Sequence, residues 1–284
     1  NDVDAFIEEF QKNYVPPDPE DSETSDVFNV VEVGPYRLRY SKMGDAGETV
    51  ILIHGFGGSA DRWLFTQEPL SAHASVYALD LPGHGESTKI IEDGSLTGMA
   101  SVILGFMDAV GIERARLIGH SLGGAIALQA ALDKPERIQS LALIAPAGLG
   151  PEINDNYISG FITADSRKEM KPLLKQLVAD ESLINRALVN DMVQFKRIDN
   201  VTEALRTIAA GFMHNAKQTV DLRSGLEGLS LPVKLIWGSE DKIIPAHHAE
   251  GLSDNVRVDI LQGFGHLVQL EAAADVNALL SDNS

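Results

Sequence analysis

A serine, an aspartate and a histidine stand in this chain where nucleophilic catalysis needs them. Ser121 lies in a Gly-x-Ser-x-Gly pattern, between a strand-like stretch, Arg-Leu-Ile, at residues 116–118 and an alanine-rich stretch after Gly124. A strand that runs through this pattern into a helix forms a nucleophile elbow. Its glycines permit a tight turn, and the serine hydroxyl is exposed at the carboxyl end of the sheet. We therefore expect Ser121 to be the nucleophile of an acyl-transfer reaction.

Asp241 and His266 are the expected partners of this nucleophile. Each follows an apolar stretch typical of a buried strand, and both come after Ser121, in the order Ser, Asp, His. A neutral serine is a poor nucleophile, so His266 is expected to accept its proton while Asp241 fixes the imidazole tautomer. Glu240, the neighbour of Asp241, is the alternative acid.

Two backbone amides are candidates for an oxyanion hole. The apolar residues 49–53 are followed by His-Gly-Phe-Gly-Gly at residues 54–58, and glycines at the end of a strand let a backbone amide approach a substrate. We expect the N–H groups of Phe56 and of Leu122, which opens the helix after Ser121, to stabilise a developing oxyanion.

Three further residues have types that fit a catalytic site but positions that do not. His54 precedes the proposed site instead of facing it, and Asp80 and His84 come before Ser121 in the chain. Because the order Ser, Asp, His is the one expected after the elbow, we interpret all three as residues that structure loops.

Apolar stretches alternate with helical periodicity along most of the chain. Such alternation requires parallel strands with right-handed crossovers, so we expect an α/β fold with a mostly parallel central sheet and flanking helices. A hairpin of residues 27–33 and 36–42 should precede it. Residues 149–230 show helical spacing only, and we expect this lid segment to be a helical insertion over the carboxyl ends of the strands. The expected core comprises residues 27–148 and 231–284.

Composition excludes several classes of function. The chain has 23 basic and 41 acidic residues among 284, a net charge of −18 that disfavours nucleic acid and anionic membrane surfaces. It has no cysteine, which excludes disulfides and thiolate sites and agrees with a cytoplasmic location. The apolar runs fall short of the roughly 20 residues that span a bilayer, and no phosphate-binding glycine motif follows the first strand. We expect no metal and no bound cofactor.

The beginning of the chain differs from the rest. Residues 1–32 hold ten acidic residues and one basic residue, Lys12, which accounts for half of the net charge. We expect residues 1–26 to be a short helix followed by an acidic, proline-containing linker. Such a linker is either a tether to an upstream domain or a solvated tail.

The elbow, the loop at residues 54–58, Asp241 and Gly265-His266 resemble the α/β-hydrolase superfamily. A narrower resemblance covers nearly the whole chain and depends above all on Ala-Pro-Ala-Gly-Leu-Gly-Pro-Glu-Ile-Asn at residues 145–154. The sequence is similar there to the catalytic domains of acetoin dehydrogenase acetyltransferase components. This resemblance implies an α/β-hydrolase fold and acetyl transfer from dihydrolipoamide to coenzyme A. It also implies an upstream lipoyl domain and other dehydrogenase-complex subunits as partners, with the lipoyl group and coenzyme A as substrates.

Two other functions stay open at this point. A stand-alone serine hydrolase of an ester, a thioester or a carbon–carbon bond would use the same three residues on a small-molecule acyl substrate. A scaffold domain that kept the fold without activity is the second alternative. The His-x-x-x-Asp-Gly motif of the usual 2-oxo-acid dehydrogenase acyltransferases is absent, because Lys89 stands where the histidine before Asp93-Gly94 should be. An acetyltransferase built on this chain must therefore work through Ser121.

Overall fold

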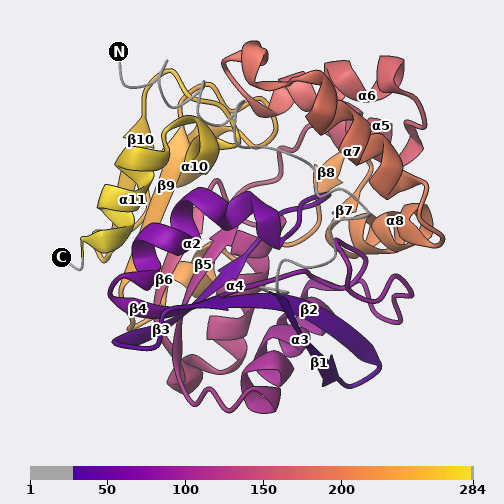
Figure 1. Ribbon diagram of the computed structural model, residues 1–284. Coiled ribbons are helices and arrows are strands. Elements are labelled where there is room, and N and C mark those ends of the chain that lie inside the picture. The colour runs from indigo at the N-terminus through magenta and orange to yellow at the C-terminus, as the bar shows by residue number, and fades with distance from the viewer. Residues whose placement is uncertain (1–27, 283–284) are drawn as a thin grey trace.

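The computed structural model describes residues 28–282, so the helix and linker expected at residues 1–26 lie outside the described residues. An eight-stranded sheet runs through the molecule with helices on both sides (Figure 1). The strands are β1 (Phe28–Val33), β2 (Tyr36–Met43), β3 (Glu48–Ile53), β4 (Ala74–Leu79), β5 (Ala115–His120), β6 (Ile138–Ile144), β9 (Val233–Gly238) and β10 (Val256–Leu261). Across the sheet their order is β1-β2-β4-β3-β5-β6-β9-β10.

The sheet is parallel from β4 to β10 and antiparallel at one edge. β1 and β2 form the expected hairpin, with Val33 opposite Tyr36, and β2 pairs antiparallel with β4. The remaining pairs are parallel. The prediction of an α/β fold with a mostly parallel sheet is therefore confirmed, and the carboxyl ends of β3, β5, β6 and β9 meet at one edge.

Both faces of the central strands of the sheet, β3, β5, β6 and β9, are buried. In β3, Ile51 and Ile53 belong to one hydrophobic core, whereas Val50 and Leu52 belong to the other. Side chains alternate across a strand, so a strand with a core on each side is apolar at every position. This explains why the parallel strands read as continuous apolar runs.

Helices cover the two faces (Figure 1). They are α2 (Leu64–Ser71), α3 (Leu96–Ala109), α4 (Leu122–Asp133), α10 (Val268–Glu271) and α11 (Ala273–Ser281). Helices α3 and α4 contribute to the core that contains Ile51, and α2 and α11 contribute to the core that contains Val50. The sequence predicts one final helix over residues 268–280, but Ala272 leaves the helical region, with φ −125° and ψ 44°, and divides it into two.

The lid segment lies between β6 and β9. It contains α5 (Asp155–Thr163), α6 (Arg167–Leu174), α7 (Arg186–Lys196), α8 (Val201–Phe212) and α9 (Arg223–Glu227). The sequence predicts helices only here, but β7 (Met213–His214) and β8 (Lys217–Gln218) form a short antiparallel hairpin. Asn215 and Ala216 have positive φ angles of 48° and 60°, which is the geometry of a tight hairpin turn. Met213 is therefore extended, although its spacing suggests a helix.

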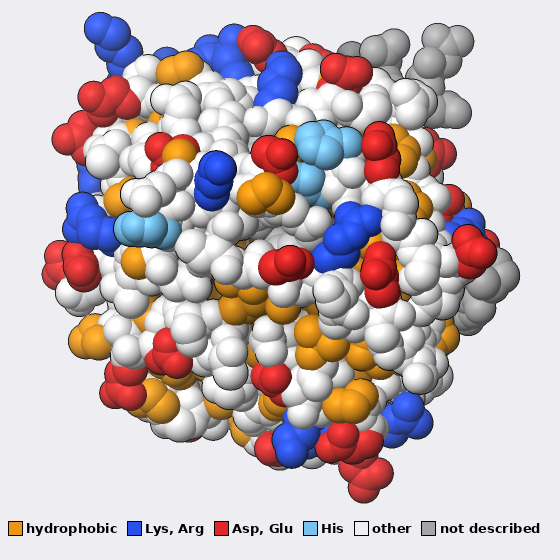
Figure 2. Space-filling model, turned by 180° about the vertical axis from the view of Figure 1, so that it is seen from behind, with side chains coloured by type: hydrophobic (Ala, Val, Ile, Leu, Met, Phe, Trp, Pro, Cys, Tyr) orange, Lys and Arg blue, Asp and Glu red, His pale blue; other side chains and the backbone are white. Residues whose placement is uncertain are grey.

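No helix within residues 28–282 is long and apolar enough to cross a membrane. The face turned away in Figure 1 carries acidic and basic side chains side by side, and its hydrophobic side chains lie in small groups (Figure 2). On the described part of this face the charges of both signs are mixed.

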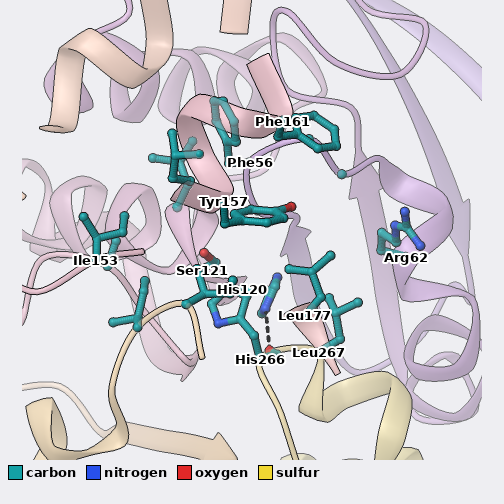
Figure 3. Close-up of a pocket in the computed structure, with 18 of the residues that line it drawn as sticks. Phe56, Arg62, His120, Ser121, Ile153, Tyr157, Phe161, Leu177, His266 and Leu267 are labelled. Carbon is teal, nitrogen blue, oxygen red and sulfur yellow. Dashed lines mark hydrogen bonds between the residues drawn. The ribbon is translucent and has the colours of Figure 1, made fainter. Parts of the chain in front are cut away.

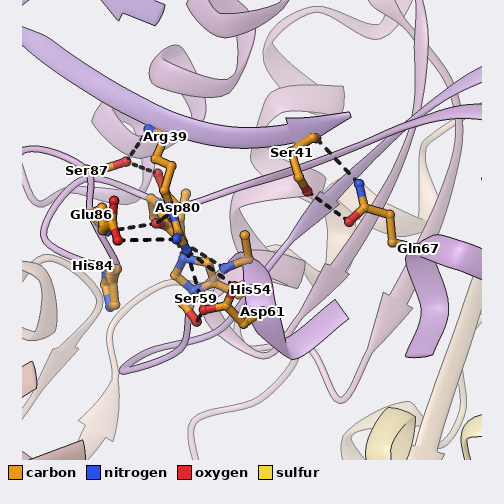
Figure 4. Close-up of polar contacts among 12 residues, drawn as sticks. Arg39, Ser41, His54, Ser59, Asp61, Gln67, Asp80, His84, Glu86 and Ser87 are labelled. Atoms are coloured by element: carbon orange, nitrogen blue, oxygen red, sulfur yellow. Dashed lines mark hydrogen bonds and ion pairs between the residues drawn. The ribbon is translucent and has the colours of Figure 1, made fainter. Parts of the chain in front are cut away.

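A buried ion pair joins β2 to the loop after β4 (Figure 4). The Arg39 Nε donates to the Asp80 carboxylate at 2.6 Å, and both side chains are buried. Asp80 also accepts hydrogen bonds from the backbone amides of Ala60 and Glu86, at 2.8 Å each. A carboxylate with a cationic partner and two amide donors is well compensated for its burial. Asp80 is thus a structural residue that fixes two loops, as its sequence position suggests.

Replacing Asp80 by Asn should lower the free energy of unfolding at pH 7 by about 3–5 kcal/mol, because it leaves a buried guanidinium without its counter-charge. Asp61→Asn is the matched control. This second acidic partner of Arg39 is 61% exposed, so its loss should cost less than about 1 kcal/mol. Urea unfolding of the two variants measures both quantities.

The cost of Asp80→Asn should depend on pH. Burial raises the pKa of Asp80, but the nearby Arg39 outweighs burial and holds this pKa below its ordinary value. A carboxyl with a lowered pKa stabilises the fold above its unfolded pKa of about 4 and loses that contribution as pH falls through the folded pKa. The difference between wild type and variant should therefore shrink below about pH 4. A difference that stays constant down to pH 3 would contradict this account.

Candidate active site

Ser121 occupies the strained turn that its glycine-rich motif predicts. Its φ of 54° and ψ of −118° lie outside the regions that residues with a side chain favour. A Cβ on Gly119 would lie 2.3 Å from the carbonyl oxygen of Gly123, and one on Gly123 would lie 2.2 Å from that of Ile53. Only glycine allows β5, α4 and β3 to approach this closely. The motif therefore has a steric cause in the fold.

Hydrogen bonds from the neighbouring strand and loop hold the turn in place. The Ser121 amide donates to the Ile144 carbonyl at 2.9 Å, and the Ser121 carbonyl accepts from the amide of Ala147 at 3.1 Å. Because α4 begins at Leu122, the serine lies at the positive end of the helix dipole. The elbow is thus fixed on both sides at the carboxyl edge of the sheet.

Asp241 and His266 meet through a direct hydrogen bond. The His266 Nδ1 donates to the Asp241 Oδ2 at 2.7 Å. The same oxygen accepts from the Trp237 indole at 3.0 Å, and the other accepts from the amides of Ile243 and Ile244 at 2.8 and 3.0 Å. These bonds keep the carboxylate in one orientation and leave the Nε2 of the imidazole available. The alternative acid, Glu240, is exposed and has no contact with His266 in the described part of the chain.

Ser121 and His266 line the same small cavity (Figure 3). Within residues 28–282 no hydrogen bond joins the serine hydroxyl to the imidazole. This contact is often long in an unliganded enzyme and tightens when substrate binds. The fold therefore brings the three candidate residues, far apart in sequence, to one place.

The two candidate oxyanion donors also line this cavity. Within residues 28–282 the amides of Phe56 and Leu122 donate to no other protein group, so both are available to a ligand. The next amide, that of Gly57, donates instead to the His84 Nε2 at 3.0 Å. This bond fixes the loop and removes Gly57 from the set of possible donors. Phe56 is left, together with Leu122, as a candidate amide donor to an oxyanion.

His54 and His84 are buried beneath this loop and act as neutral hydrogen-bonding groups. The His54 Nδ1 donates to the Gly55 carbonyl at 2.8 Å, and its Nε2 accepts from the Leu81 amide at 3.0 Å. Burial lowers the pKa of His54 and lowers that of His84 to about 3, so neither is charged at neutral pH. Their geometry agrees with the structural roles expected for them.

Two residues that position the site are not indicated by any sequence motif. The His120 Nε2 donates to the backbone carbonyl of His266 at 2.9 Å, and burial keeps the pKa of His120 well below its ordinary value. Glu271 accepts from the amide of Gly265 at 2.6 Å and from those of Ala179 and Asp180 in the lid segment at 2.8 and 3.1 Å. His120 is one of the two residues that the Gly-x-Ser-x-Gly motif leaves unspecified, and Glu271 lies in a helix, so neither carries a local signal.

The cavity above Ser121 is small and mostly apolar. Phe56 and Leu267 from the core and Ile153, Tyr157 and Leu177 from the lid segment are among its walls (Figure 3), and we call it the inner cavity. Its volume is about 40 Å³, room for only a few water-sized groups. The ring of Tyr157 lies over Ser121, and its burial raises the pKa of the hydroxyl, which stays protonated.

One cluster of metal-ligand type occurs among the described residues. It consists of Glu152, His247 and His248, whose candidate ligand atoms lie within 4.8 Å of one another. The His248 Nε2 and a Glu152 oxygen are 2.7 Å apart, an ordinary hydrogen bond. None of the three residues lines the inner cavity.

The sequence of residues 48–273, most of the chain, matches a family model described as the alpha/beta hydrolase fold. The chain belongs to the α/β hydrolase family. The dihydrolipoyllysine-residue acetyltransferase component of the acetoin cleaving system of Cupriavidus necator is 40% identical to it, over 98% of this chain and 75% of that relative. The component of the same name from Pseudomonas putida is 42% identical, over 98% and 74%. The resemblance drawn from the sequence is thus confirmed.

Hydrolases of the same family are also similar. A 2-hydroxy-6-oxononadienedioate/2-hydroxy-6-oxononatrienedioate hydrolase of Paraburkholderia phymatum is 30% identical, over 91% of this chain and 95% of that relative. The solved structure of a meta-cleavage product hydrolase from Pseudomonas fluorescens superposes with a TM-score of 0.80 at 25% identity, over 89% of this chain and 95% of that one. This α/β hydrolase therefore has relatives with transferase names and relatives with hydrolase names.

Ser121→Ala should abolish acyl-enzyme formation while leaving the fold intact, because it removes one hydroxyl at the cavity wall. Labelling by a fluorophosphonate probe, with circular dichroism as the check on folding, measures this. Asp241→Asn should lower kcat by about 10⁴-fold, the cost of the wrong imidazole tautomer.

Glu240→Gln is the matched control for Asp241→Asn, because this neighbouring carboxyl is exposed and outside the hydrogen-bond network. It should retain wild-type turnover. Undiminished labelling of Ser121→Ala, or a large loss in Glu240→Gln with none in Asp241→Asn, would show that the roles are assigned to the wrong residues.

Proposed function

We propose that this α/β hydrolase transfers small acyl groups through an acyl-serine at Ser121, and that its reaction is acetyl transfer from dihydrolipoamide to coenzyme A. The observation that carries the proposal is the inner cavity, where Ser121 and His266 lie under apolar walls with room for only a small acyl group, and where Asp241 holds His266 by a hydrogen bond. The names of the acetoin-cleaving relatives support the same reaction.

The first half of the reaction loads the serine. The Ser121 Oγ attacks the thioester carbonyl while the His266 Nε2 takes its proton, and the imidazolium is stabilised by Asp241. The amides of Phe56 and Leu122 donate to the oxyanion that forms. Collapse of the tetrahedral intermediate breaks the carbon–sulfur bond, and His266 returns the proton to the sulfur. The products are the free dihydrolipoyl thiol and acetyl-Ser121.

The second half reverses these steps with another thiol. The coenzyme A thiol gives its proton to His266 as its sulfur attacks the acetyl carbonyl, and the oxyanion forms again at the same two amides. Cleavage of the ester bond returns the proton to Ser121 and releases acetyl-coenzyme A. No atom changes its oxidation state, so the proposed reaction needs no redox cofactor.

Exclusion of water is what distinguishes a transferase from a hydrolase, since both pass through the same acyl-serine. Ser121 and His266 are 8% and 2% exposed, and most side chains around them are apolar. A buried, apolar site of this kind limits the access of water to the acyl group and favours a thiol delivered to it. The size of the inner cavity also favours an acetyl group over a bulky acyl group.

A stand-alone hydrolase is the second candidate. The similarity to the 2-hydroxy-6-oxononadienedioate hydrolase and to the meta-cleavage product hydrolase favours it, because both share the fold over most of their length. Such an enzyme would let water, not a thiol, attack the acyl-serine. The two functions thus differ in one product.

Partitioning of the acyl group decides between them. Purified enzyme with S-acetyl-dihydrolipoamide and saturating coenzyme A should form acetyl-coenzyme A as the main product and little free acetate, because the acyl-serine is shielded from water. Chromatographic quantitation of the two products measures the ratio, with Ser121→Ala as the control for uncatalysed exchange. Acetate as the main product would refute the transferase function and leave the hydrolase.

A further inference from the structure

A second, larger cavity adjoins the inner one. It lies between the lid helix α7 and the core, where Leu64 and Leu270 belong to the core and Leu188 and Ile198 to the lid side, and we call it the outer cavity. Its volume is about 620 Å³, against about 40 Å³ for the inner cavity. A small acyl group does not need this space. The size of the outer cavity fits instead the carrier to which an acyl group is attached.

The two cavities share part of their walls. Gly57, Gly58, Arg62 and Met192 line both. Arg62, in the 3-10 helix Ala60–Trp63, donates from its Nη2 to the Met192 Sδ of α7 at 3.6 Å. A thioether is a weak acceptor on a flexible side chain, so separating this contact costs little. Figure 3 shows Arg62 on the side of the inner cavity to which the Tyr157 hydroxyl points.

The walls of the outer cavity suit an uncharged ligand. Six apolar side chains lie beyond the shared part, Leu64, Phe65, Leu188, Phe195, Ile198 and Leu270, with the amides of Asn185 and Gln194 among them. The ionic groups are two bases, Arg39 and Arg62, and three acids, Asp61, Glu86 and Asp191.

The bases do not make this cavity attractive to an anion. Arg39 is held by Asp80 at 2.6 Å and pairs with Asp61 and Glu86 at 3.4 and 3.6 Å. With more acids than bases on its walls, and a net charge of −18 on the chain, the outer cavity repels a polyphosphate. An aliphatic chain that ends in an amide can instead bury its methylenes against the apolar walls. The side-chain amides in the same walls can form hydrogen bonds with the amide of that chain.

We propose that the outer cavity is the binding site of the dihydrolipoyl arm, an uncharged chain of methylenes that ends in an amide. The arm enters between α7 and the core, passes the contact of Arg62 with Met192 and presents its thioester to Ser121. This assignment rests on the proposed function. The assignment names the dihydrolipoyl arm as the occupant of the outer cavity. It also places the anionic part of coenzyme A outside this cavity.

The test uses two exposed residues that line only the outer cavity. Leu64 and Ile198 are 52% and 47% exposed, so changing both to Asp should leave the fold intact while placing two charges beside the arm. The two donors compared are S-acetyl-dihydrolipoamide and methyl thioacetate, which carries the same acetyl group without an arm. The double variant should lower the ratio of kcat/KM for the long donor over the short donor by about tenfold, mainly through KM, since buried methylenes lose an apolar wall.

Ile90→Asp is the matched control. Ile90 is 66% exposed and lines neither cavity, so the same change of residue there should leave the ratio at its wild-type value. An unchanged ratio in the double variant would overturn the assignment. So would a double variant in which KM rises for coenzyme A and not for S-acetyl-dihydrolipoamide.

Failure of the proposed function gives a different result. A wild-type enzyme that converts S-acetyl-dihydrolipoamide to acetate is not a transferase, yet the ratio of the two donors still tests the arm site. A wild-type enzyme that does not react with S-acetyl-dihydrolipoamide overturns both the function and the arm site.

Discussion

The site depends on one backbone conformation, the left-handed turn at Ser121. A residue with a side chain at a φ of 54° costs on the order of 1–3 kcal/mol unless its surroundings impose it. Here β5 and α4 close around it through Gly119 and Gly123, and hydrogen bonds with Ile144 and Ala147 hold both its amide and its carbonyl. The strain puts the hydroxyl into the inner cavity and the Leu122 amide beside it. Every other group of the site is arranged around this fixed point.

Buried polar groups also fix the loops that surround Ser121. His84 holds the Gly57 amide, and Asp80 with Arg39 holds the segment on which that loop continues, so Phe56 presents its amide beside the serine. Glu271 joins the loop before His266 to the lid segment, although burial raises the pKa of its carboxyl and the amides that it accepts from lower it only in part. Buried charges and imidazoles outside the proposed triad therefore set the distances between the candidate catalytic groups.

The sequence predicts the parts of this site that local geometry dictates. Ser121 was identifiable because glycines two residues away on each side are required by the turn, and Asp241 and His266 because each follows a strand in a fixed chain order. The hairpin at β7 and β8, the break at Ala272 and the hydrogen bonds of His120 and Glu271 were not predictable, because they depend on contacts between distant segments. The volumes of the two cavities were not predictable from the sequence either. The two cavities adjoin where α7 contacts the core at Arg62 and Met192. No local sequence pattern predicts that contact.

The central claim of this account is that Ser121 carries the acyl group between two thiols. Mass spectrometry of the enzyme after rapid mixing with S-acetyl-dihydrolipoamide, followed by peptide mapping, tests it most directly. The account predicts one acetyl group on the peptide that contains Ser121, removed when coenzyme A is added. Turnover without an acetylated Ser121, or an acetyl group on another residue that coenzyme A removes, would contradict it.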